Sequence, residues 1–109
     1  MNFSPLILES MGYSWRTRAP LKYDRGFEVI TVPEGFSTDL ASVPRALWNV
    51  LPPFGKHAKA AVLHDYLYGS RQRPRKECDK IFLEAMKALG VSKTRRTVMY
   101  WGVRLFGRW

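Results

Sequence analysis

The sequence lacks the features that cross-link, anchor or export a small protein. Its only cysteine is Cys78, which excludes an intramolecular disulfide and a zinc site built from cysteine pairs. No apolar run approaches the roughly 18 residues of a membrane-spanning helix. The first residues, MNFSPLILESMG, have neither the basic start nor the small-residue cleavage site of a signal peptide. We therefore expect a soluble protein of a reducing compartment, with no signal peptide and no transmembrane segment.

Acidic residues are scarce as well. Nine Asp and Glu stand against 18 Lys and Arg, which gives a net charge of +9. Nearly all of the excess lies from Arg71 onward, where eleven basic residues oppose three acidic ones. A patch of this charge attracts an anionic surface or a phosphate-bearing partner. The residues expected to form it are Arg71, Arg73, Arg75, Lys76, Arg95 and Arg96.

No segment repeats and none is of low complexity. The hydrophobic content of 46% over 109 residues is enough to build the core of a single domain, residues 1–109. Two short runs, at 21–23 and 27–32, flank a glycine-containing turn at 24–26 and predict a β-hairpin. The pattern changes from strands to helices near residue 40.

Up to four helices are expected after that point. Ser42, before Val43-Pro44, is typical of an N-cap and predicts a short helix that ends before Pro52. Longer helices are predicted over about 57–68, 74–89 and 92–106, with Gly69-Ser70 and Gly90 as terminators. The predicted fold class is α+β, in which a short N-terminal antiparallel β-hairpin or sheet precedes three to four helices. Two of these helices are expected to pack antiparallel.

A histidine and an aspartate fall on the apolar faces of these two helices. His64 lies on the apolar face of the first, and Asp79 lies among apolar residues of the second. An unpaired buried carboxylate costs several kcal/mol, so Asp79 needs a partner, and His64 and Tyr68 are the natural candidates. An aspartate on one imidazole nitrogen leaves the other nitrogen to accept a proton, as in a general base. The structural alternatives are a carboxylate stabilised by the helix dipole and a buried polar network.

Asp65 borders the same helix face from its flank. A carboxylate there suits calcium or magnesium, but one carboxylate is far short of a full oxygen cage, so other ligands must come from the backbone or water. His57 precedes His64 by two turns, about 10.5 Å along the axis, and the two cannot share one metal. We expect His57 to be a helix-start residue.

The segment 35–45 forms the corner between strand and helix. Loops at such corners commonly present ligands, which makes Asp39, Ser42 and Arg45 candidates to support the site. Asp39 and Ser42 are also good turn and cap residues, and Arg45 suits either a phosphate or a carboxylate. The sequence leaves both interpretations open.

One face of the last predicted helix carries an apolar stripe of Val98, Trp101, Leu105 and Trp109. Such a stripe is typical of a face packed in the core, and Arg96, Tyr100 and Arg104 lie away from it. Aromatic residues together with arginines are also typical of a helix at a lipid interface. Nucleic acid would suit the basic segment too, although no zinc-finger, P-loop or RNA-binding aromatic motif supports it.

Two blocks of the chain resemble an uncharacterised family of small phage and prophage proteins. The first block is Thr38-Asp39-Leu40-Ala41-Ser42-Val43-Pro44-Arg45, and the second is His64-Asp65-Tyr66-Leu67-Tyr68, followed by Asp79. The resemblance spans most of the chain. It implies a bacteriophage or prophage protein, located in the cytoplasm of the host or associated with the virion, and it implies no particular activity.

A local resemblance points to an activity. His64-Asp65-Tyr66-Leu67-Tyr68 and Cys78-Asp79-Lys80-Ile81-Phe82 are similar to the catalytic blocks of calcium-dependent phospholipases that cleave at the sn-2 position. The resemblance implies that His64 activates water, that Asp79 orients His64 and that Tyr68 bonds to Asp79. It also implies calcium as a cofactor, with Asp65 as a ligand. Those enzymes have a glycine-rich calcium loop before the catalytic helix, where this chain has Pro52-Pro53-Phe54-Gly55.

Two functional hypotheses follow. In the first, the chain hydrolyses an ester in a lipid or another anionic substrate, with His64 and Asp79 as the catalytic residues. Tyr68, Asp39, Ser42 and Arg45 would support them, and the basic last third would hold the substrate surface. In the second, the chain is a non-enzymatic phage accessory or virion-associated protein. Its basic helical face would then bind a host partner, a membrane surface or nucleic acid.

Overall fold

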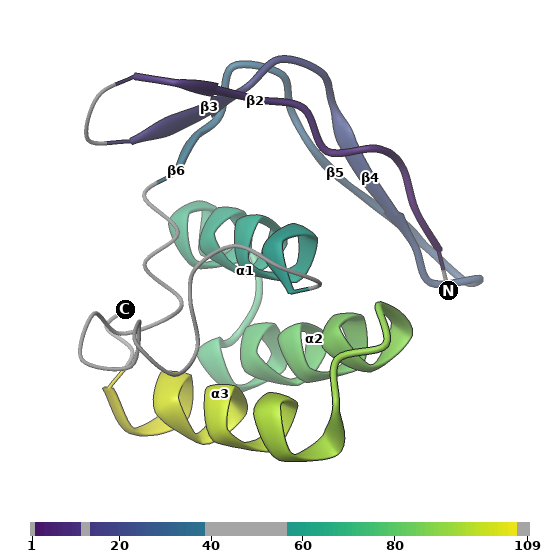
Figure 1. Ribbon diagram of the computed structural model, residues 1–109, viewed down its shortest axis with the longest axis vertical. Helices are drawn as coiled ribbons and strands as arrows, with labels where there is room; N and C mark the ends of the chain where they lie inside the picture. Colours follow the sequence, from purple (N-terminus) through teal and green to yellow (C-terminus); the bar gives the residue numbers. More distant parts are fainter. Residues whose placement is uncertain (1, 12–13, 39–56, 107–109) are drawn as a thin grey trace. The chain divides into compact units, whose positions relative to one another are not determined.

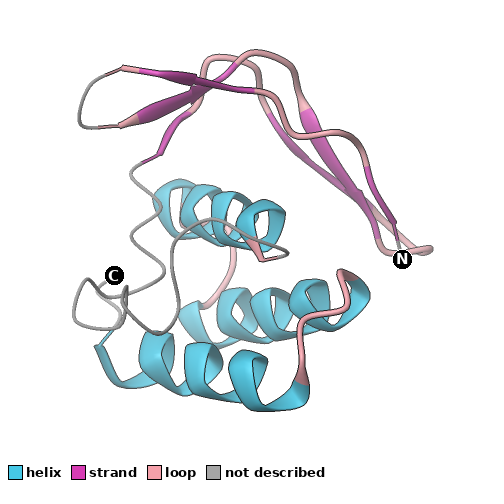
Figure 2. Ribbon diagram, in the orientation of Figure 1, coloured by secondary structure: helices cyan, strands magenta, loops and turns pink. Residues whose placement is uncertain are grey.

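A computed structural model describes residues 2–11, 14–38 and 57–106 of the chain (Figures 1 and 2). The chain divides into two compact units, which we call the strand unit, Met1–Asp39, and the helical unit, Leu40–Trp109. Their boundary coincides with the change of pattern predicted near residue 40. Strands come first and helices follow, so the predicted α+β fold class is confirmed. That all 109 residues form one domain stays a prediction.

The described part of the strand unit contains two small antiparallel sheets of three strands each. One sheet has the order β1-β4-β5, and the other has the order β2-β3-β6. The strands of the first sheet are β1 (Asn2–Phe3), β4 (Leu21–Asp24) and β5 (Val29–Val32). Those of the second are β2 (Leu8–Ser10), β3 (Trp15–Thr17) and β6 (Ser37–Thr38).

Strands β4 and β5 form the predicted hairpin. Leu21 pairs with Val32 and Asp24 pairs with Val29, so the four turn residues 25–28 lie between the strands. Gly26 has φ +93°, a conformation that glycine adopts readily, and its N–H donates to Asp24 Oδ1 at 2.8 Å. The second strand therefore begins at Val29, two residues later than the sequence predicted. Its side chains alternate between buried and exposed, as expected for a sheet with one covered face.

The described part of the helical unit consists of α1 (Ala58–Ser70), α2 (Arg75–Ala88) and α3 (Lys93–Phe106). Helix α2 lies between α1 and α3 and contacts both (Figure 1). His57 is the N-cap of α1, as expected of a helix-start residue. The three longer predicted helices are thus confirmed, and the short helix predicted after Ser42 lies outside the described residues.

Two helix ends differ from the prediction. Gly69 and Ser70 do not terminate α1. Both residues are helical, and the C-cap is Arg71, which has φ +52° and donates its N–H to the Leu67 carbonyl oxygen at 3.3 Å. At the start of α2, Pro74 is the N-cap rather than the first helical residue, because its ψ of 146° is extended. Glycine lowers helix propensity without forbidding the conformation, which is why Gly69 can be helical.

The turn between α2 and α3 follows from two residues. Gly90 has φ +79° and donates to Lys87 O at 3.1 Å, and Val91 donates to Met86 O at 3.0 Å. These bonds form the Schellman motif that closes a helix C-terminus. Ser92 then caps α3, because its hydroxyl accepts the Arg95 N–H at 3.3 Å.

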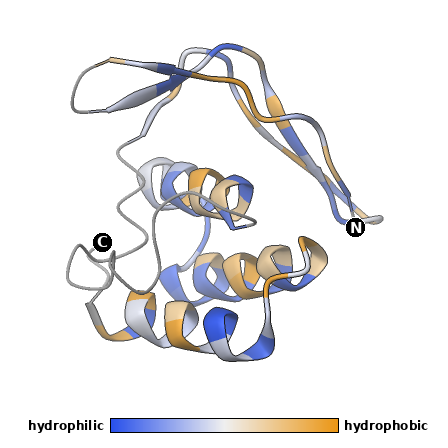
Figure 3. Ribbon diagram, viewed as in Figure 1, coloured by the Kyte–Doolittle hydropathy of each residue, from blue (hydrophilic) through white to orange (hydrophobic). Residues whose placement is uncertain are grey.

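The apolar core of the helical unit lies where α1, α2 and α3 meet. Helix α1 is buried on several sides, since Ala60, Ala61, Val62 and Leu63 have no exposed surface. Figure 3 shows apolar stretches on α1 and α2, with hydrophilic stretches between them. The fully or nearly buried apolar residues of the other two helices are Cys78, Ile81, Phe82, Ala85, Met86, Met99 and Val103.

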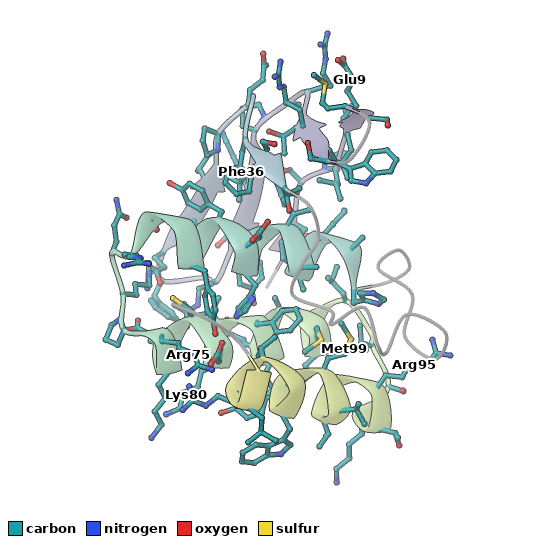
Figure 4. All side chains as sticks on the ribbon, turned by 90° about the vertical axis from the view of Figure 1, so that its left-hand side faces the viewer. Glu9, Phe36, Arg75, Lys80, Arg95 and Met99 are labelled. Carbon is teal, nitrogen blue, oxygen red and sulfur yellow. The ribbon has the colours of Figure 1, made fainter. Side chains whose placement is uncertain are left out.

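The side of α3 that faces the core is the side opposite to the predicted one. Val98, Trp101 and Leu105 are exposed, whereas Met99 and Val103 are buried. Figure 4 shows Met99 between α2 and α3. The prediction that the apolar stripe packs in the core is therefore wrong for these three residues, and its fourth member, Trp109, lies outside the described residues. The ion pair between Arg104 on α3 and Asp79 on α2 favours this rotation of α3.

Candidate functional site

Asp79 is the centre of a polar cluster inside the helical unit. It lies in the second turn of α2 and has no exposed surface. Its Oδ1 bonds to His64 and to the Tyr68 hydroxyl, both on α1, and its Oδ2 accepts a hydrogen bond from Arg104 on α3. One carboxylate thus contacts side chains from both neighbouring helices. We call His64, Tyr68, Asp79 and Arg104 the Asp79 cluster.

The predicted pairing of His64 with Asp79 is present in the structure. His64 Nε2 lies 2.7 Å from Asp79 Oδ1, and the imidazole side chain is 2% exposed. Its ring stacks on Phe82, with ring centroids 4.6 Å apart, and lies 4.1 Å from the Tyr68 ring. Packing and the hydrogen bond together fix the orientation of the imidazole.

Tyr68 bonds to the same carboxylate oxygen. Burial and the hydrogen bond to Asp79 raise the pKa of Tyr68 from 10.0 to about 12. The phenol therefore stays protonated at neutral pH, and its O–H donates a hydrogen bond to Asp79. Arg75 contacts the same hydroxyl, with Nε 3.2 Å from the Tyr68 oxygen.

The sequence interpretation missed Arg104 as a member of the cluster. Its Nη1 lies 2.8 Å from Asp79 Oδ2, so the two side chains form an ion pair. Because an unpaired buried carboxylate is costly, this pair favours the rotation of α3 that points Arg104 inward and leaves Trp101 outside. The available signal was the spacing of Arg96, Tyr100 and Arg104, which places all three away from the apolar stripe.

Arg75 of α2, which contacts the Tyr68 hydroxyl, also forms hydrogen bonds with the C-terminal end of α3. Its Nη2 donates to the carbonyl oxygens of Val103 and Arg104, both at 2.7 Å. The last carbonyls of a helix lack partners within the helix, so a guanidinium there both satisfies them and complements the helix dipole. Arg75 was predicted to bind an anionic surface, and in the structure it makes these internal bonds. Figure 4 shows it beside α2.

The cluster holds Asp79 as a carboxylate. Burial acts to raise the pKa of Asp79, but hydrogen bonds from His64, Tyr68 and Arg104 outweigh it and lower the pKa below the ordinary 3.8. An ionised carboxylate only accepts hydrogen bonds, so His64 must donate through Nε2–H. In the neutral ring, the lone pair is then on Nδ1. Nδ1 is therefore the atom of His64 that can take a proton.

The described residues do not form a metal site. Within residues 2–11, 14–38 and 57–106, no group of three His, Cys, Asp or Glu side chains is arranged to hold an ion. Asp65 is partly buried on α1, next in sequence to His64. Calcium needs six to eight oxygens, and Asp65 brings only one carboxylate, so this donor set does not fit calcium. Asp39, the other suggested oxygen donor, lies outside the described residues.

The remaining predicted residues fall into two groups. Asp39, Ser42 and Arg45 lie outside the described residues. Of the predicted anionic-surface residues, Arg73 pairs with Glu77 at 3.2 Å, and Arg96 donates to the Val91 carbonyl at 3.2 Å. The other three are exposed: Arg71, Lys76 and Arg95. The described part of the chain has no helix long and apolar enough to span a bilayer.

Comparison with known proteins identifies a family whose function is unknown. A family model described as "Protein of unknown function (DUF1353)" matches residues 15–103. The "Uncharacterized protein y4jT" of Sinorhizobium fredii is 36% identical over 78 residues, which cover 70% of this chain and 23% of that protein. The chain thus spans about a quarter of the length of this relative. No solved structure matches it. Because the family model covers most of the chain, including His64, Tyr68 and Asp79 of the cluster, the chain belongs to the DUF1353 family.

Proposed function

We propose that the chain is an ester hydrolase in which His64 activates water. The observation that carries this proposal is the 2.7 Å hydrogen bond from His64 Nε2 to an Asp79 carboxylate that two further donors keep ionised. This is the arrangement that orients an imidazole and stabilises its protonated form. The resemblance of both sequence blocks to sn-2-cleaving phospholipases supports the same reaction.

In the proposed reaction, Nδ1 of His64 removes a proton from water as the oxygen attacks the ester carbonyl carbon. The carbonyl electron pair moves onto oxygen and gives a tetrahedral intermediate. When this intermediate collapses, the bond to the alcohol oxygen breaks, and His64 returns the proton to that oxygen. Asp79 stays ionised throughout and stabilises the imidazolium. Arg45, outside the described residues, stays our proposed partner for the oxyanion.

The net charge of +9 supports an anionic substrate, and we propose a lipid or another anionic ester. We further propose that the protein belongs to a bacteriophage or prophage and acts in the host cytoplasm or on the virion. The support for this origin is the order of the two sequence blocks around Asp39 and His64.

A second function is favoured by the burial of the cluster. His64 is 2% exposed and Asp79 has no exposed surface, whereas a general base must be reached by water and substrate. In this alternative, the Asp79 cluster holds α1, α2 and α3 in register. The chain would then be a non-enzymatic phage accessory or virion protein that binds through its basic helical face.

Hydrolysis assays on two variants separate the two functions. The substrates are phosphatidylglycerol vesicles and a soluble short-chain ester, and the variants are His64→Gln and His57→Gln. His57 is the matched control, because it is also a buried histidine of α1 but does not belong to the cluster. Loss of a general base should lower kcat by about 100- to 10,000-fold in His64→Gln only. Full activity of His64→Gln, or no hydrolysis by the wild-type chain, would contradict the hydrolase and favour the binding protein.

A further inference from the structure

We propose that the outer face of α3, formed by Val98, Trp101 and Leu105, binds the surface of an anionic lipid membrane. The inference deepens the proposed function, on which it rests for the choice of substrate. It concerns how the protein reaches a lipid, and binding can be measured without any hydrolysis.

The first observation is the exposure of the three side chains. Val98 is 44% exposed, Trp101 is 54% exposed and Leu105 is 70% exposed. Their spacing of three and four residues places them on one side of the helix. Single exposed apolar residues are common, but a contiguous face with a tryptophan at its centre indicates an interaction site.

The second observation is the charge of α3. The helix from Lys93 to Phe106 carries four basic residues and no acidic one. At 100° per residue, Arg95 and Lys93 lie on opposite flanks, roughly 90° to 110° from the centre of the apolar face. Both side chains are exposed, and Figure 4 shows Arg95 directed away from the helices. An amphipathic helix with such flanks suits a surface with anionic headgroups above an apolar layer.

The position of these cations within the helix strengthens the argument. Lys93, Arg95 and Arg96 occupy the first turn, the hydrophilic start of α3 in Figure 3. Cations in the first turn oppose the helix dipole and weaken the helix. Arg96 donates to the Val91 carbonyl oxygen at 3.2 Å, and an anionic partner would offset the unfavourable position of the exposed Lys93 and Arg95.

A lipid surface fits this face better than two other occupants. Nucleic acid offers phosphates and stacked bases, but aliphatic Val98 and Leu105 do not stack on bases. A second copy of the chain, packed face to face about a two-fold axis parallel to α3, would bring the cationic flanks of both copies together. Anionic lipid satisfies the cations and the apolar side chains at the same time.

The same helix connects this face to the Asp79 cluster. Trp101 and Arg104 are one turn apart on α3, and Arg104 pairs with Asp79 at 2.8 Å. A membrane bound at Trp101 would therefore lie on the helix that contacts the proposed catalytic pair. This connection explains why one helix would combine an exposed apolar face with an inward-pointing arginine.

The test is flotation of the full chain with vesicles of phosphatidylcholine alone and of equal parts phosphatidylcholine and phosphatidylglycerol. We expect binding to the anionic vesicles, weakened by salt, and little binding to the neutral ones. Trp101→Gln and Leu105→Gln should each lower the apparent affinity about tenfold. Phe27→Gln, at an apolar residue 74% exposed in the strand unit, should bind as the wild type does.

Charge is tested in the same assay by Arg95→Gln and Lys93→Gln. The control is Lys22→Gln, which removes one exposed positive charge from β4. Circular dichroism confirms that each variant is folded, and exposed positions tolerate such changes well. Binding that is equal for the α3 variants and the controls would overturn the inference, because the charge of the whole protein would then suffice.

Two other results would also overturn it. One is a dimer in sedimentation that Trp101→Gln dissociates. The other is binding to duplex DNA that Trp101→Gln weakens, without any binding to vesicles. His64→Gln should bind anionic vesicles as the wild type does. Vesicle binding without hydrolysis would therefore keep this inference and remove the proposed hydrolase, whereas hydrolysis of a soluble ester without vesicle binding would do the reverse.

Discussion

Asp79 is a negative charge in the core, and its neighbours determine what it contributes to stability. Its pKa is lower in the folded protein than in the unfolded chain, because the bonds from His64, Tyr68 and Arg104 outweigh the effect of burial. A lowered pKa means that the carboxylate stabilises the fold fully above its ordinary pKa of 3.8. This contribution is lost as the pH falls through the lower pKa of the folded state.

Asp79→Asn should therefore reduce the free energy of unfolding by about 3 kcal/mol at neutral pH, because it breaks a buried, hydrogen-bonded ion pair. The difference from the wild type should shrink as the pH falls below about 4. Urea unfolding at a series of pH values measures both effects. Glu77→Gln, at an exposed carboxylate of the same helix, is the control and should change little. A difference that does not vary with pH would contradict the assignment of the charge to Asp79.

Tyr68 should have the opposite effect on the pH dependence of stability, because its pKa is raised rather than lowered. Its pKa is about 12 in the folded protein and 10.0 without these surroundings. Its raised pKa stabilises the fold fully below pH 10.0, and that stability is lost as the pH rises through about 12. Titration of the phenolate absorbance should show that Tyr68→Phe removes one tyrosine from the late transition. If the late transition keeps its full amplitude in Tyr68→Phe, Tyr68 does not contribute to it.

At the scale of helices and strands, residue patterns predicted the elements themselves better than they predicted the contacts between side chains. Periodicity and cap residues were enough for α1, α2, α3 and the hairpin, because these features are local. The pairing of His64 with Asp79 was also predictable, since a carboxylate on an apolar face requires a partner on the neighbouring helix. The rotation of α3 was not predictable from its own sequence. It depends on the pair between Arg104 and Asp79, which lie 25 residues apart.

The helix ends give a paired test with glycine. Gly90→Ala should destabilise the protein by about 1 kcal/mol, because φ +79° strains any residue with a Cβ atom. Gly69→Ala should instead stabilise it by up to about 1 kcal/mol, because Gly69 is helical and an added Cβ meets no atom within 4 Å. Thermal unfolding of both variants gives the two signs. Equal effects of the two substitutions would show that backbone conformation is not decisive at Gly90.

At the scale of the whole molecule, the division into two units makes the helical unit separable in principle. The hydrogen bonds of the Asp79 cluster come from α1, α2 and α3, all within Leu40–Trp109. Residues 40–109 expressed alone should therefore keep their helices and the bond between His64 and Asp79. Circular dichroism and the NMR signal of the His64 Nε2 proton would measure this. A fragment without helical signal would show that the strand unit is required for folding.

The Asp79 cluster also has a consequence for how this family can diverge. A single carboxylate accepts hydrogen bonds from His64 and Tyr68 on α1 and from Arg104 on α3. Replacing Asp79 alone would leave an inward-pointing guanidinium without its counter-ion. Replacing Arg104 alone would leave the buried carboxylate with Arg75 as its cation, whose Nε lies 4.0 Å from Asp79 Oδ2 and is more distant than Arg104. Positions 79 and 104 should therefore change together in related sequences. A relative with a neutral residue at position 79 is expected to have lost the arginine at 104, and its last helix would then be able to turn its tryptophan inward.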